Sequence, residues 1–97
     1  MGVRPRQRPK RLAAKLLAIR SALGLSQTQM VVRLEAEGMI VPGQISEFET
    51  DKREPSLLIL LQYSRLARVH MEDLVDDDVD LPAKLPGRVR HGAQLTR

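Results

Sequence analysis

The side chains with the clearest chemical capacity in this sequence are the cations near its amino terminus. Residues 1–20 hold seven Lys or Arg residues and no Asp or Glu, while the whole chain of 97 residues has a net charge of +4. Arg4, Arg6 and Arg8 alternate with Pro and polar residues in a stretch with almost nothing to bury. We therefore expect residues 1–10 to form a flexible basic arm that contacts a polyanion, although a solvated tail has the same composition.

The remaining residue types disfavour catalysis. The chain has no Cys, and its two His residues, His70 and His91, are far apart in sequence, which disfavours thiol chemistry and metal binding. No Ser has a neighbouring His to act as a base, and no Gly-rich phosphate loop is present. We expect neither an enzyme nor a cofactor or metal site.

The hydrophobic pattern favours a protein of the cytoplasm. The longest apolar run, Leu57 to Leu61, is far too short to span a membrane, and no signal peptide opens the sequence. Hydrophobic residues make up 42% of the chain, which indicates a folded domain, and aromatic residues only 2%, which indicates an aliphatic core.

The elements that must position these side chains are helices. Apolar residues recur with helical spacing from Leu12 to Leu23, and Gly24 is suited to end that helix. Ser26 and Gln29 have the spacing of a capping box, so they predict a second helix, which we expect to end at Gly38.

Three further helices complete the expected domain. Pro42 is typical of a first helical position, and we expect the third helix to end near Thr50. The fourth helix begins after Ser56 with its buried positions at Leu57, Leu60, Leu61, Ser64 and Ala67, which leaves Leu58 and Ile59 outside the stripe. A short fifth helix spans Val69 to Leu74, and no strand pattern occurs. The sequence predicts an all-α domain over residues 11–75, followed by an acidic-then-basic extension over residues 76–97 that ends as a loose tail.

Three short motifs follow one another along this domain. They are Gly24-Leu25-Ser26-Gln27, then Ile45-Ser46-x-x-Glu49, then Arg53-Glu54-Pro55-Ser56. In this order they resemble the helix-turn-helix domains of the lambdoid repressor and Cro type, also called Xre-like, over residues 11–75. The resemblance implies a five-helix lambda-repressor-like DNA-binding domain. It also implies a transcriptional regulator, more specifically a repressor. Such a protein would bind double-stranded DNA as a homodimer, with its third helix in the major groove.

By position, the resemblance assigns the exposed start of the third helix to base edges. Pro42, Gly43, Gln44 and Glu47 would face the bases. Gln44 is able to bond adenine through two contacts, and Glu47 is able to accept from the amino group of cytosine.

Other positions would contact the phosphate backbone. The resemblance places Gln27 and the loop residues Lys52 and Arg53 there, with Arg4, Arg6 and Arg8 of the arm. The alternative interpretation of Gln27 is an ordinary polar residue at a helix start. The alternative interpretation of the loop cations is solvated surface charges.

Arg20 and Glu49 occupy the places where this family has a buried ion pair. Such a pair would join the first and third helices and set the angle of the reading helix. The simpler interpretation is two unrelated surface charges.

The sequence departs from the family pattern in three places. The span from Ser26 to Ser46 is longer than usual, which predicts an extended turn, and Val31 replaces a small residue where the two helices cross. The third helix also presents Glu47 without any Lys or Arg. These features keep a second hypothesis open, in which the fold serves as an adaptor or antitoxin-like module that binds a protein partner and little DNA.

Overall fold

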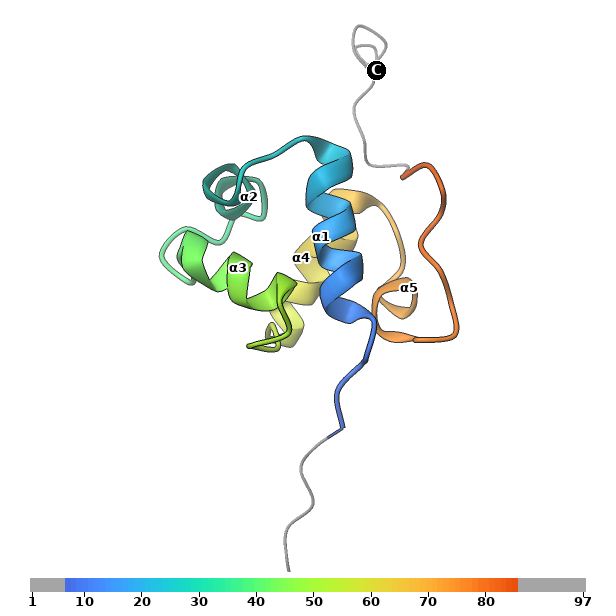
Figure 1. Ribbon diagram of the computed structural model, residues 1–97. Coiled ribbons are helices and arrows are strands. Elements are labelled where there is room, and N and C mark those ends of the chain that lie inside the picture. The colour runs from blue at the N-terminus through green and yellow to red at the C-terminus, as the bar shows by residue number, and fades with distance from the viewer. Residues whose placement is uncertain (1–6, 86–97) are drawn as a thin grey trace, which may run out of the picture.

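The computed structural model describes residues 7–85, and this part of the chain holds five helices and no strand (Figure 1). The predicted all-α fold is confirmed. Arg4 and Arg6 of the expected arm, and the expected loose tail after Leu85, lie outside the described residues. The helices are α1 (Leu12–Leu23), α2 (Gln27–Arg33), α3 (Pro42–Glu49), α4 (Leu57–Ala67) and α5 (Met71–Val75).

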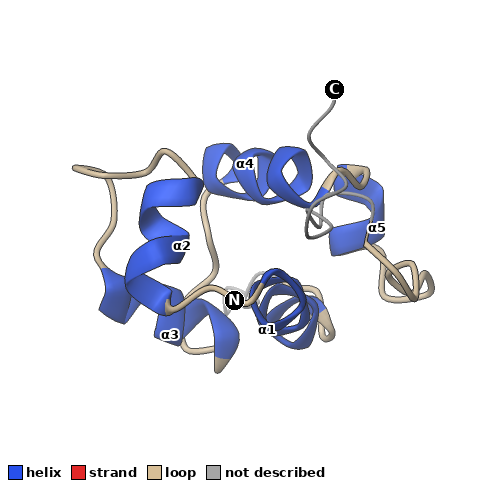
Figure 2. Cartoon of the chain, turned by 90° about the horizontal axis from the view of Figure 1, so that it is seen from above, coloured by secondary structure: helices blue, strands red, loops and turns tan. Residues whose placement is uncertain are grey.

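Helix α1 lies between α3 and α5 and contacts both of them (Figure 2). Helix α2 packs on α3, and α4 packs on α5, so the helix-turn-helix pair α2–α3 lies to one side of α1. Three local signals fix where helices begin. The Ser26–Gln29 capping box opens α2, Pro42 occupies the first position of α3, and Ser56 accepts from the Ile59 amide to open α4.

The core is aliphatic apart from Phe48 and Tyr63, as the composition predicts. The positions expected to be buried are mostly so, while Leu23 and Leu61 are only half-buried. The expected residues found buried are Leu16, Ile19, Met30, Leu34, Ile45, Phe48, Leu60 and Leu74.

The expected buried stripe of α4 is wrong at its start. Leu57 is 74% exposed, whereas Ile59 is buried and Tyr63 is fully enclosed. Because residues 57–61 are all apolar, helical periodicity alone does not fix the rotation of the helix about its axis. Ile59 and Leu60 face the core in the first turn of α4, so Leu57 and Leu58 of the same turn remain on the surface.

The expected end of the second helix at Gly38 is also wrong, since α2 ends at Arg33. The Ala36 amide donates to the Val31 carbonyl at 3.0 Å. Glu35 has a φ of 55°, a left-handed conformation that glycine adopts most easily. This turn places the Ala36 side chain in the core. The early stop lengthens the connection between α2 and α3 to residues 34–41.

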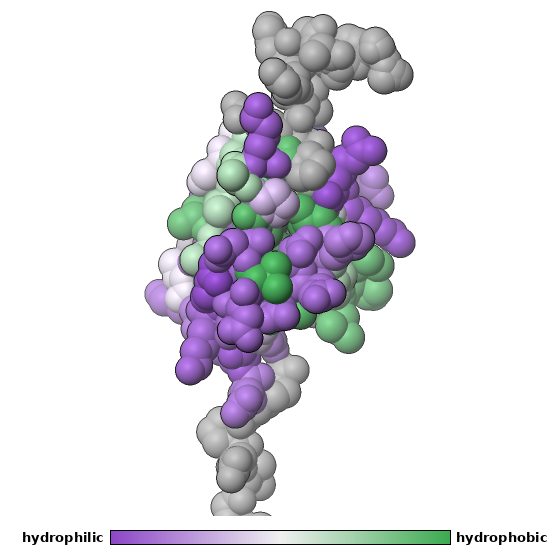
Figure 3. All heavy atoms as spheres, turned by 90° about the vertical axis from the view of Figure 1, so that its right-hand side faces the viewer, coloured by the Kyte–Doolittle hydropathy of each residue, from purple (hydrophilic) through white to green (hydrophobic). Residues whose placement is uncertain are grey.

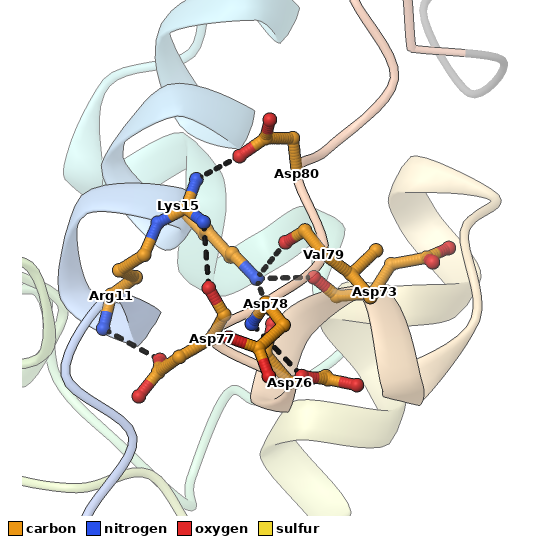
Figure 4. A network of polar contacts seen from close by, with 8 residues as sticks. All are labelled: Arg11, Lys15, Asp73, Asp76, Asp77, Asp78, Val79 and Asp80. Atoms are coloured by element: carbon orange, nitrogen blue, oxygen red, sulfur yellow. Dashed lines mark hydrogen bonds and ion pairs between the residues drawn. The ribbon is translucent and has the colours of Figure 1, made fainter.

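Lys15 belongs to the fold and not to a surface available to a polyanion. Its ammonium group is buried and donates to the main-chain carbonyls of Asp73 and Asp76 at 2.8 Å and of Val79 at 2.6 Å. Figure 4 shows these bonds. The lysine of α1 therefore satisfies the carbonyl groups at the end of α5 and holds the following segment in place.

The acidic run in turn bonds the two residues that lead into α1. The Asp77 carboxylate accepts from the Lys10 and Arg11 amides at 2.9 Å, and Arg11 also bonds the Asp77 carbonyl and the Asp80 carboxylate. The two amides lower the pKa of Asp77, and the Arg11 hydrogen bond lowers that of Asp80. Residues 76–80 thus pack against α1, and Leu85 beyond them is buried in the core.

Hydrophilic side chains cover most of the lower half of the face that is turned to the viewer in Figure 3, and hydrophobic side chains gather at its right-hand edge.

Within residues 7–85, no helix has the length and apolarity needed to cross a bilayer. The same residues bring together no group of three or more His, Cys, Asp or Glu suited to a metal ion.

We expect Lys15→Met to lower the free energy of unfolding by about 1–3 kcal/mol, because three buried carbonyl groups lose their donor. Urea unfolding monitored by circular dichroism measures this loss. The control is Lys84→Met, since Lys84 is exposed. Equal stability of the two variants would show that the Lys15 ammonium does not hold the end of α5.

Candidate nucleic-acid interface

An ion pair between α1 and α3 sets the orientation of the third helix. Arg20 Nε donates to Glu49 Oε2 at 2.6 Å, and Arg20 Nη2 donates to Glu49 Oε1 at 3.0 Å. The Glu49 side chain is 4% exposed and that of Arg20 is 20% exposed. Because two parallel bonds fix both position and angle, this contact defines how α3 lies against α1.

The same guanidinium reaches the turn before α2. Arg20 Nη1 donates to the Leu25 carbonyl at 2.9 Å, and the Gln27 amide group lies 3.5 Å from Glu49 Oε1. One arginine therefore joins α1, the start of α2 and the end of α3. Gln27, which the sequence assigns to phosphate, is half-buried beside this pair.

Tyr63 of α4 lies in the core close enough to this pair to interact with both charges. Its side chain is fully enclosed, and its hydroxyl has no hydrogen-bond partner among the described residues. Burial raises the pKa of the phenol, with a smaller contribution in the same direction from Glu49.

The start of α3 presents an uncharged surface. Val41 and Gly43 are exposed, and Pro42 and Gln44 are half-exposed. The Gln44 Oε1 atom accepts from the Val41 amide at 3.1 Å, which caps the helix. The amide nitrogen of Gln44 is then the donor that this side chain offers to a ligand.

Glu47 and Arg53 form an ion pair, with Arg53 Nε 2.6 Å from Glu47 Oε1. The sequence assigns Glu47 to a base edge and Arg53 to phosphate. The structure brings the two together on one surface, so the negative charge of α3 is neutralised by the following loop.

Arg8 of the arm reaches the same loop. It donates to the Asp51 carboxylate at 3.0 Å and to the Asp51 carbonyl at 3.2 Å, while Lys52 is exposed. Arg8 and Arg53 are therefore each paired with an acid, whereas Lys52 has no ion pair among those that the described residues show. The charges around the end of α3 therefore nearly cancel, because Glu47, Asp51 and Glu54 accompany these three cations.

A groove of about 490 Å³ adjoins this surface. It runs between the α2–α3 loop, the side of α3 and the start of α4, and Gln44 and Arg53 contribute to its wall. The exposed side chains of Met39, Leu57 and Val75 also line it. Helical spacing assigned Leu57 to the buried side of the fourth helix and gave no reason to include Met39, so it did not predict this lining.

The sequence matches no protein-family model, and no curated protein matches it at a significant level. Among solved structures, the chain is similar to the P22 c2 repressor protein, in a crystal structure with synthetic operator 9T in the presence of Tl+. The two chains are 20% identical with a TM-score of 0.60, and the match covers 75% of this chain and 100% of the other. The chain has a lambdoid repressor fold.

Within this lambdoid repressor fold, residue types and spacing alone did not predict which polar side chains pair. The Arg20–Glu49 pair was expected only from the family resemblance. The Glu47–Arg53 pair had no sequence signal, because a spacing of six residues does not bring side chains together on a helix. The pair forms because the chain turns at Asp51, which has a φ of 62°.

We expect Arg20→Met and Glu49→Leu each to destabilise the fold by about 3–5 kcal/mol, because each leaves the other charge unpaired in a largely buried site. The double variant should recover much of that loss. A double-mutant cycle from urea unfolding measures the coupling, with Glu47 and Arg53 as the exposed control pair at under about 1 kcal/mol. Additive effects at Arg20 and Glu49 would contradict the account.

We expect the stability of the protein to fall as the pH rises above about 10, because the unfolded phenol of Tyr63 releases its proton while the folded one retains it. The sign follows from the raised pKa in the folded state. Tyr63→Phe should lose this part of the alkaline decrease and be at least as stable as the parent at neutral pH, since the buried hydroxyl has no partner.

Tyr63 is the sole tyrosine, so the ultraviolet absorbance of tyrosinate reports its titration directly. An ordinary pKa in the folded protein, or a large loss of stability in Tyr63→Phe at neutral pH, would show that the hydroxyl is solvated or bonded.

Proposed function

We propose that this protein is a transcriptional regulator, acting as a repressor, that binds double-stranded DNA with α3 in the major groove. The observation that carries the proposal is the helix-turn-helix pair held by Arg20 and Glu49 with one side of α3 left exposed. The similarity to a repressor in complex with an operator supports it. A helix held at a fixed angle is what a major groove accommodates.

In this proposal the start of α3 meets base edges. Gly43 has no side chain, so the DNA is able to approach the helix closely there. Gln44 donates to a base through its amide nitrogen while its oxygen caps the helix at Val41. If the cap is released, Gln44 bonds adenine through both amide atoms. Pro42 adds apolar contact without a backbone donor.

Phosphate contacts come from the cations around α3. Lys52 is exposed in the loop after α3, and Arg8 bonds Asp51 of the same loop. Arg4 and Arg6 would add the positive charge that this surface otherwise lacks. Gln27 contributes a contact at the start of α2.

A domain of this size makes few base contacts alone, so we propose a homodimer on two half-sites about one helical turn apart. The apolar side chains beside the groove, including Leu57 and Leu58, give a specific reason to consider a protein partner as well. An adaptor or antitoxin-like role without strong DNA binding is the second candidate function.

Selection of bound sequences from a random duplex pool tests the proposal. We expect the intact protein to enrich a sequence with two-fold symmetry. Gln44→Ala should change the preferred base at one position in each half-site, because it removes a base contact. Deleting residues 1–10 should instead weaken binding to every sequence and reduce the salt dependence, since those cations meet phosphates.

The exposed residue Arg65 provides a matched control, because it lies on α4 and outside the proposed interface. Arg65→Ala should bind like the parent. If the intact protein retains no duplex at low salt, the adaptor role takes precedence. If Gln44→Ala binds with an unchanged preference, α3 does not read bases through this residue.

A further inference from the structure

Glu47 and Arg53 are held together by main-chain and side-chain bonds. The Arg53 amide donates to the Glu47 carbonyl at 3.2 Å, the Lys52 amide donates to the same carbonyl at 2.9 Å, and Arg53 Nε donates to Glu47 Oε1 at 2.6 Å. The loop therefore folds back onto the exposed side of α3. This arrangement fixes the guanidinium before any ligand arrives, which reduces the entropy that binding would cost.

The bond leaves one edge of each group free for a ligand. Because Arg53 uses Nε toward Glu47, its two terminal nitrogens form the remaining edge, and two parallel donors of this kind match the O6 and N7 acceptors of guanine. The carboxylate of Glu47 keeps lone pairs that are able to accept from the N4 amino group of cytosine. Both side chains are about half-exposed, at 51% for Arg53 and 41% for Glu47.

The charge of the pair favours a base over a phosphate. A carboxylate 2.6 Å from the guanidinium offsets its positive charge, so the pair attracts a phosphate less than an unpaired arginine does. A base edge has no net charge, so its hydrogen bonds to the pair depend less on that attraction. Lys52, which is exposed in the same loop, is the better phosphate contact.

We infer that Glu47 and Arg53 act as one unit that reads a G·C base pair in the major groove, with Arg53 bonding guanine and Glu47 accepting from cytosine. This inference rests on the proposed DNA binding. It changes the role that the sequence gives Arg53, from phosphate contact to determinant of specificity.

The test uses the full chain and the duplex recovered from the random pool. At the conserved G·C pair, guanine is replaced by 7-deazaguanine, which lacks N7, or the pair is changed to A·T. We expect the parent to lose about tenfold in affinity or more on either change. Arg53→Lys should lose this discrimination although it keeps the charge, because an ammonium group cannot make the paired contact.

Glu47→Gln should reduce the same discrimination, since the guanidinium is no longer held. The matched control, Lys52→Ala, should keep the discrimination and reduce the salt slope by about one. If Arg53→Lys keeps the parent's preference, or if Arg53→Ala weakens all duplexes equally with a smaller slope, Arg53 contacts phosphate and the inference is wrong. A recovered sequence without a preferred G·C pair also overturns it, whereas failure to retain any duplex overturns the proposed function itself.

Discussion

The two bonds between Arg20 and Glu49 fix the angle between α1 and α3, and the arrangement of the exposed surface depends on them. Without them, the short helix α3 would rest on α1 only through apolar contacts, which are not directional. The guanidinium also bonds the carbonyl of Leu25, so the turn into α2 is tied to the same point. One largely buried charge pair thus joins the parts of the helix-turn-helix unit and, together with the buried Ile45 and Phe48, fixes which side of α3 faces solvent.

The distribution of the cations divides the molecule into a structural side and a side available for binding. Lys15 and Arg11 are engaged with residues 73–80, and these bonds join the start of α1 to the end of α5 and the segment after it. The cations left near α3 are few, and two of them, Arg8 and Arg53, are paired with acids. In the proposed DNA complex, such a surface would rely on hydrogen-bonding geometry more than on net charge.

The sequence predicted what local chemistry determines and missed what depends on distant partners. The starts of α2, α3 and α4 follow from Ser26, Pro42 and Ser56, because a cap involves residues only a few positions apart. The role of Lys15 could not be predicted, since its acceptors lie 58 to 64 residues away in sequence. At the site, the exposed start of α3 followed from the resemblance, whereas the pairing of Glu47 with Arg53 required the turn at Asp51 to be known.

We propose that duplex DNA binds on the surface held in place by Arg20 and Glu49. Nuclear magnetic resonance of the backbone amides during titration with the selected duplex locates the binding surface residue by residue. The largest chemical-shift changes are expected at Gly43, Gln44, Glu47 and Lys52, with little change around Asp73 at the end of α5. Changes confined to Met39, Leu57 and Leu58, or no changes at all, would show that DNA does not bind there.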